Sequence, residues 1–187
     1  MENEIYVARI EGISPLLINR PSEMIIAAKS KERKIDSATP REIAEGKLYK
    51  DKDNKIFIPD IYLKNCLVEA GKAIKISGKG SSRATYSKII GYAVEINPME
   101  IPLVSSEFEV YSVLAVNPNT KGRVMLHRPI FHSWSLDFEI HFDEKEIPQD
   151  DLKNCLDIGG RTVGIGDWRP AKKGRFGKLH VTYWQKK

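Results

Sequence analysis

The sequence has few cysteines, no long apolar run and no cluster of metal-ligating residues. Its two cysteines, Cys66 and Cys155, have no further Cys or group of His nearby to complete a metal site. We therefore expect buried, reduced thiols, no metal and no cofactor. No stretch of about 18 apolar residues occurs, so no transmembrane helix is expected. The N-terminus lacks the basic and apolar regions of a secretory signal, which predicts a cytoplasmic protein without membrane contact.

Acidic residues are scarce in two long segments. No acid lies between Glu69 and Glu95, and Asp167 is the only one from residue 161 to the end, although the net charge is only +5. Such segregation is typical of a surface that binds a polyanion, because each cation placed on a phosphate releases counterions. Two solvated loops are the alternative explanation. The bases in these segments are Lys72, Lys75, Lys79, Arg83 and Lys88, and then Arg161, Arg169, Lys172, Lys173, Arg175, Lys178, Lys186 and Lys187.

The hydrophobic pattern predicts a single α+β domain spanning residues 1–187. Leu63, Leu67 and Ala70 share one face of a helix that starts at Pro59, and acids in the first turn predict a second helix from Pro148. From Ser133 to Phe142 apolar and polar residues alternate cleanly, as in a strand with one wet face. The other strands are predicted at residues 4–13, 56–58, 108–116, 123–131 and 178–184.

Two segments interrupt this pattern. Residues 19–55 are polar and broken by prolines, with a short helix from Pro40 to Tyr49, and residues 76–91 form a basic loop. Without these insertions and one additional strand, the order is β-α-β-β-α-β. That is the ferredoxin-like arrangement, which is also RRM-like, with an antiparallel sheet and both helices on one face. By analogy, its free face is where RNA-recognition modules stack bases.

The segment from Val163 to Gly177 combines three features that single-strand binding requires. Its glycines let backbone N–H groups approach a phosphate, its Arg and Lys side chains neutralise charge, and its aromatic rings offer stacking planes. The spacing is neither a dinucleotide fingerprint nor a P-loop. A helix C-cap followed by a loop with Trp168 packed on the core is the alternative. The candidate residues here are Gly164, Gly166, Trp168, Arg169, Lys172, Lys173, Gly174, Arg175 and Phe176, and outside it Lys79, Arg83, Lys88 and Arg128.

This segment, running into a terminal strand, resembles the glycine-rich loop of the RAMP superfamily, the RNA-binding proteins of CRISPR effector complexes. The opening Ile10 to Leu16 is similar to their first strand, and Ile58-Pro59 to the segment before their first helix. The resemblance to their backbone subunits implies a ferredoxin-like fold and a role in an antiviral ribonucleoprotein. It also implies as partners a guide RNA, copies of the same chain and other effector subunits. Residues 19–55 or 76–91 would then supply a thumb-like insertion.

Two other functions remain open. His127 or His132 with Lys172 or Arg169 would suit a metal-independent endoribonuclease, as in the RNA-processing RAMP proteins, although histidines in strands are more often surface residues. Asp36, Asp51 and Asp53 could hold a metal ion that cleaves bound RNA, although turn geometry explains Asp51 to Asn54 more simply. A phage factor that binds a host protein is the third possibility, which the basic segments disfavour.

Overall fold

The core of the protein is a four-stranded antiparallel sheet with strand order β4-β8-β1-β9. Its strands are β1 (Glu4–Gly12), β4 (Val94–Asn97), β8 (Ser135–Phe142) and β9 (Leu179–Lys186). The structure is a computed structural model that describes residues 4–21, 38–76, 84–104, 107–116 and 120–187.

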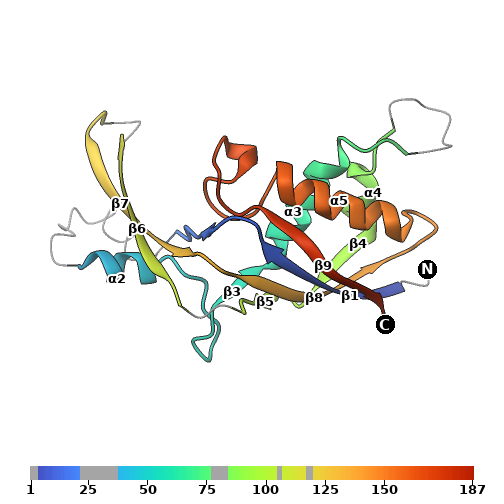
Figure 1. Ribbon diagram of the computed structural model, residues 1–187, viewed down its shortest axis with the longest axis horizontal. Helices are drawn as coiled ribbons and strands as arrows, with labels where there is room; N and C mark the ends of the chain where they lie inside the picture. The colour runs from blue at the N-terminus through green and yellow to red at the C-terminus, as the bar shows by residue number, and fades with distance from the viewer. Residues whose placement is uncertain (1–3, 22–37, 77–83, 105–106, 117–119) are drawn as a thin grey trace.

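Two helices cover one face of this sheet and pack on each other (Figure 1). They are α3 (Asp60–Gly71) and α5 (Gln149–Thr162). The chain order β1-α3-β4-β8-α5-β9 with this strand order is the ferredoxin-like arrangement, so the predicted fold class is confirmed. None of the helices in the described part of the chain has the length and apolar character needed to cross a membrane.

The second strand of the core was not predicted from the sequence. β4 follows directly on the short helix α4 (Ser87–Ala93), whose first part lies in the predicted loop at 76–91. Only Val94 and Ile96 of β4 are buried, and two alternating residues are too few to reveal a period of two. Pairing with β8, rather than local pattern, makes this segment a strand.

The strands predicted at 108–116 and 123–131 exist, but they lie outside the core sheet. β6 (Glu109–Val116) and β7 (Arg123–Phe131) form an antiparallel ribbon, to which β2 (Leu16–Leu17) adds a third strand. In Figure 1 the ribbon extends away from the core sheet. Helix α2 (Pro40–Glu45) packs against it, beginning where predicted but ending before Tyr49. The short elements β3 (Phe57–Pro59), β5 (Glu100–Pro102) and η1 (Pro170–Lys172) complete the described structure.

The hydrophobic core lies between the sheet and the two helices. Alternation along β8 places Leu136, Phe138, Ile140 and Phe142 in this core, as predicted, and each is at most 3% exposed. Burying one such side chain contributes about 1.5–3 kcal/mol relative to leaving it in water. Both cysteine thiols are also buried and unpaired.

The open face of the sheet differs from a base-stacking platform. All four core strands are described, and on this side they present Tyr183 and two histidines, His141 and His180, but no Phe or Trp. Arg9 is paired with Asp137 at 2.6 Å and Lys187 with Glu139 at 2.8 Å. Two further carboxylates, on Glu11 and Glu95, lie on the same face. The acids and paired cations of this face disfavour RNA binding, because acids repel phosphate, and base stacking on this face stays a prediction.

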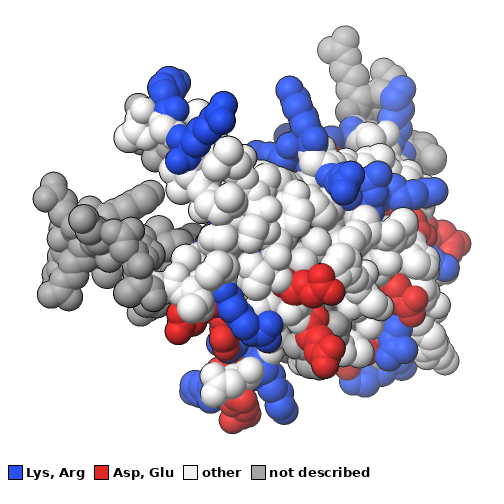
Figure 2. Space-filling model, turned by 60° about the vertical axis from the view of Figure 1, so that its left-hand side comes forward, with Lys and Arg blue, Asp and Glu red and all other residues white. Residues whose placement is uncertain are grey.

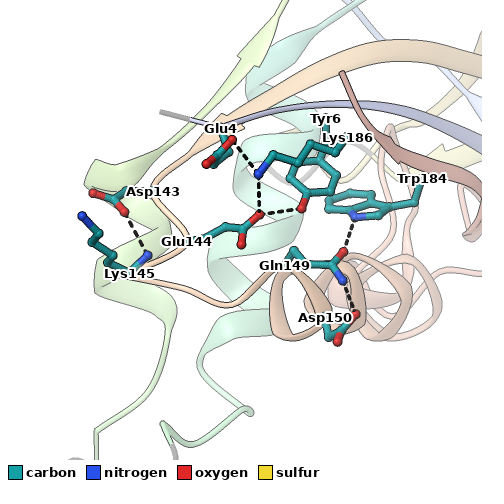
Figure 3. Close-up of polar contacts among 9 residues, drawn as sticks. All are labelled: Glu4, Tyr6, Asp143, Glu144, Lys145, Gln149, Asp150, Trp184 and Lys186. Atoms are coloured by element: carbon teal, nitrogen blue, oxygen red, sulfur yellow. Dashed lines mark hydrogen bonds and ion pairs between the residues drawn. The ribbon is translucent and has the colours of Figure 1, made fainter. Parts of the chain in front are cut away.

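Polar contacts hold the turn between β8 and α5 against the adjacent ends of β1 and β9 (Figure 3). Tyr6 donates a hydrogen bond to Glu144 at 2.5 Å, and Lys186 Nζ lies 3.7 Å from the same carboxylate oxygen. Trp184 Nε1 donates to Gln149 Oε1 at 2.9 Å. Burial, and then the adjacent Glu144 carboxylate, raise the pKa of Tyr6 to about 12.

The free energy of unfolding should therefore fall with rising alkaline pH. The Tyr6 phenol ionises near 10 in the unfolded chain and only near 12 in the folded protein. Its contribution to the free energy of unfolding is fully present below pH 10 and is lost between pH 10 and about pH 12. Urea unfolding from neutral pH to about pH 11 measures this loss. The free energy of unfolding should fall less steeply with pH for Tyr6→Phe than for the unaltered protein. Tyr183→Phe, which removes an exposed phenol, should leave the slope unchanged, and an equal slope for Tyr6→Phe would refute the assignment.

Candidate nucleic-acid interface

The glycine-rich loop, residues 163–178, connects α5 to β9 and is held in one conformation by backbone hydrogen bonds. Ile165 N donates to Gly177 O at 2.9 Å, and Gly177 N donates to Pro15 O at 2.8 Å. Gly177 has a φ of +67°, and a Cβ on it would lie 1.8 Å from the Ile165 oxygen, so no other residue fits there. The loop is thus a fixed scaffold for its side chains.

Two of the candidate glycines use their N–H groups within the fold. Gly164 N donates to Gly159 O at 2.8 Å and Gly174 N donates to Arg169 O at 3.0 Å, so neither is free to bind phosphate. Gly166 has a φ of +79° and packs against the backbone of Leu17, where a Cβ would meet an oxygen at 2.6 Å. These glycines shape the loop and bring it close to β2.

Three cations of the loop are exposed. They are Lys172 at the end of η1, Lys173 in the left-handed conformation (φ 61°) and Arg175. Within the described residues none of the three has an ion-pair partner. The single acid of the loop, Asp167, is engaged elsewhere. The loop therefore presents uncompensated positive charge from a rigid backbone, which suits a phosphate chain.

The aromatic residues of the loop are packing residues. Phe176 is 5% exposed in a small cluster with Leu17 and Ile130, so the expectation that it stacks on a base is wrong. Trp168 is half-buried against the same cluster, in an edge-to-face contact with Tyr111 whose ring centroids are 6.1 Å apart. Because these contacts fix the loop to the ribbon, the alternative reading of Trp168 as packed is the one observed.

Arg128 is also buried, contrary to the expectation that it faces nucleic acid. Its side chain is 8% exposed, its Nε lies 2.9 Å from Asp167 Oδ2, and its guanidinium lies 4.6 Å above the Trp168 ring. The Nε contact is an ion pair without hydrogen-bond alignment, and Nη1 has no hydrogen-bond partner in the described structure. Lys47 is nearby and donates to the His127 carbonyl at 2.7 Å, and burial followed by the Arg128 charge lowers its pKa. Arg128 thus joins the ribbon to the loop.

A pocket of about 140 Å³ lies between α3 and the glycine-rich loop. Arg169 lines it from the loop, where Nη1 also donates to Gly166 O at 3.1 Å. From α3 the lining residues include Tyr62, Asn65 and Glu69, which sequence reasoning missed. Their spacing places them on one side of the helix, where Asn65 and Glu69 are exposed, and this polar side of the helix was the signal that sequence analysis could have used.

Lys88 is separated from the loop. It is exposed on α4, whose N-cap residue Tyr86 donates to Asp151 in the first turn of α5. The loop follows the other end of this 14-residue helix, about 20 Å away. Lys79 and Arg83 lie outside the described residues.

His127 does not lie where the nuclease hypothesis requires. His127 pairs across the ribbon with Ser112 and contacts its hydroxyl at 2.7 Å, whereas its neighbour Arg128 faces the loop. Because side chains alternate along a strand, His127 points away from Lys172 and Arg169. His132 is exposed beside Glu109 at 3.3 Å.

The acids of the metal-dependent alternative are partly explained. Asp51 Oδ1 accepts hydrogen bonds from the backbone N–H groups of Asp53 and Lys55, each at 2.8 Å, as in an Asx turn. Asp36 lies outside the described residues. In the described part of the chain no three His, Cys, Asp or Glu side chains come together in a metal-binding group.

Positive charge is concentrated on one edge of the molecule. Figure 2 shows Lys and Arg side chains along the upper edge without acids among them, and acids lower on the same face, mixed with further cations. The glycine-rich loop and the end of the ribbon lie at this upper level in Figure 1. Not all cations of the acid-poor segments are free of acids, since Lys72, Lys186 and Lys187 are ion-paired with carboxylates.

Comparison with known proteins gives little further information. No protein-family model and no curated protein sequence matches the chain. Among solved structures, the crystal structure of Cmr6 from Pyrococcus furiosus is similar, with a TM-score of 0.40 and 10% sequence identity over 96% of this chain and 99% of that chain. A similarity at this level bears on neither the family nor the activity of the chain.

Proposed function

We propose that the chain binds single-stranded RNA through its glycine-rich loop, as a backbone-type subunit of a CRISPR effector ribonucleoprotein. The observation that carries this proposal is the set of three exposed, unpaired cations, Lys172, Lys173 and Arg175, on a backbone held by hydrogen bonds. A backbone already in its bound conformation loses little entropy on binding, so more of the phosphate attraction contributes to affinity. The resemblance of this loop to that of RAMP proteins adds the guide RNA as the ligand.

The ribbon supports the second part of the proposal, assembly along the strand. Leu114 and Met125 lie opposite each other on β6 and β7, and each is 52% exposed. Val116, two residues along β6 on the same face as Leu114, is 62% exposed. An apolar patch on a projecting element is typical of a protein contact. In a subunit that repeats along RNA, the adjacent copy is the partner for this patch. The ribbon then acts as the thumb-like insertion that the resemblance had assigned to residues 19–55 or 76–91.

Replacing Lys172, Lys173 and Arg175 together by Ala should weaken RNA binding and reduce its salt dependence. Each lost phosphate contact removes about 0.7 from the slope of log K against log salt for a single strand, so the slope should fall by about 2. Fluorescence anisotropy of a labelled single-stranded RNA over a range of salt concentrations measures both quantities. Light scattering of the protein with an RNA long enough for two copies tests assembly, because it measures the mass of the complex.

The matched control removes the same charge elsewhere. Lys52, Lys55 and Lys145 are exposed and lie outside the loop, so their triple Ala variant should retain the salt slope. An equal loss of slope in both variants would mean that net charge alone drives binding. An unchanged slope in the loop variant would remove the loop from the interface.

A further inference from the structure

The pocket between α3 and the glycine-rich loop has the composition of a ligand site. Val163 and Ile165 give it apolar walls, and the polar groups of Asn65, Glu69 and Arg169 lie around them. Apolar walls with a few convergent polar groups are the usual lining of small-molecule sites. The core does not require Asn65 or Glu69, since both are exposed on α3.

Size limits what this pocket can hold. Its volume of about 140 Å³ is below the roughly 300–1,000 Å³ of pockets that enclose drug-sized ligands. A single flat ring system therefore fits, while an attached sugar and phosphate stay outside. Lys172 and Lys173 follow Arg169 within four residues and are exposed, so a phosphate outside the pocket has cations within reach.

Two of the lining residues on α3 are neutral. Cys66 contributes a thiol whose pKa burial raises to about 12, so it carries no charge near neutral pH. Tyr62 presents its ring, and its hydroxyl lies 3.1 Å from the Tyr49 hydroxyl. Burial and then this hydrogen bond raise the pKa of the Tyr62 phenol. An uncharged wall with an aromatic ring accepts an uncharged aromatic ligand.

The charged groups at the pocket select among such ligands. One oxygen of Glu69 is held by Lys72 at 2.6 Å, in an exposed pair of little energetic value that a ligand can replace. A carboxylate accepts two hydrogen bonds and a guanidinium donates several. Guanine alone among the bases combines two adjacent donors, N1–H and the 2-amino group, with two adjacent acceptors, O6 and N7.

We propose that this pocket binds one guanine base of the RNA strand, with Glu69 accepting from N1–H and the 2-amino group and Arg169 donating to O6 and N7. The inference rests on the proposed RNA binding and adds base selectivity to it. Asn65, which donates and accepts, completes the lining on the α3 side. The strand then places its phosphates on Lys172 and Lys173 while one base enters the pocket.

Short RNA strands test this assignment. An oligouridine that carries a single guanosine should bind about tenfold more tightly than oligouridine, since one bidentate contact discriminates by this order. Inosine at that position lacks the 2-amino group and should lose most of the gain. A 7-deazaguanosine, which lacks N7, should lose part of it. Fluorescence anisotropy at one fixed salt concentration measures all four strands.

Two variants assign the selectivity to the pocket. Glu69→Gln replaces one acceptor by a donor and should abolish the preference for guanosine while leaving oligouridine affinity in place. Lys72→Ala removes the partner of Glu69 but keeps its carboxylate, so the ratio of the two affinities should persist. Equal binding of both strands by the unaltered protein overturns the base pocket and leaves RNA binding intact. If neither strand binds even at low salt, the proposed function itself is wrong.

Discussion

Replacing Asp167 by Asn should lower the free energy of unfolding by about 3 kcal/mol, because it breaks a largely buried ion pair and leaves its partner charged. Asp167 Oδ2 faces the Nε of Arg128 at 2.9 Å, and an amide NH₂ in that place would oppose a donor with a donor. Lys47, a second buried cation beside Arg128, would then have no acid to offset it. The Asp167 Oδ1 contact with the Trp168 N–H, at 2.9 Å, is one that Asn can keep, so the loss reports the ion pair.

Thermal unfolding is the appropriate measurement, with an expected decrease in Tm of about 10 °C for a chain of this size. Asp137→Asn is the matched control, since its pair with Arg9 is about half exposed on both sides and should contribute under about 1 kcal/mol. Combining Asp167→Asn with Arg128→Met should recover much of the loss, because it removes the unpaired charge. If the two Asp→Asn variants have the same Tm, the buried pair does not stabilise the junction of ribbon and loop.

Replacing Gly177 by Ala should have an even larger effect, about 4 kcal/mol. The added Cβ would meet the Ile165 carbonyl oxygen at 1.8 Å, and the φ of +67° is unfavourable for any residue with a side chain. Because Ile165 N donates to Gly177 O, relief of the clash must break a backbone hydrogen bond that closes the loop. We expect a lower Tm and weaker RNA binding, since the cations lose their fixed spacing.

Gly91→Ala provides the control for this substitution. Gly91 lies in α4, and a Cβ there would meet nothing within 4 Å. Alanine should increase the free energy of unfolding by about 0.5–1 kcal/mol, because it lowers the entropy of the unfolded chain and favours the helix. Hydrogen exchange of the amides of Ile165 and Gly177 in the Gly177→Ala protein locates the damage. Unchanged protection at both amides would show that the loop tolerates the methyl group.

The candidate site was only partly predictable. The absence of acids around residues 169–175 indicated a basic loop, and Lys172, Lys173 and Arg175 are exposed as that pattern requires. The three pocket residues on α3 were missed, because a polar stripe on a helix is indistinguishable from an ordinary solvated face until another element lies against it. Arg169 and its loop are that element.

The sequence by itself determined those elements whose pattern is long enough to be read locally. Contacts with the core are reflected in the alternation of β8 and in the apolar spacing of α3. The glycines of the loop reflect the backbone conformation of that one segment. The predicted chain order is ferredoxin-like, although it takes a strand of the ribbon in the place of β4.

Only the tertiary structure decided which residues are exposed and which strands belong together. Arg128 and Phe176 are buried because β7 lies against the glycine-rich loop, a contact between segments more than 30 residues apart that no local pattern encodes. The same holds for β4, which is a strand because β8 pairs with it, and for the ribbon, which extends from the core instead of joining it. Whether a side chain is buried, or a strand is paired, depends on a second segment that packs against the first. The periodicity of a sequence describes only one segment.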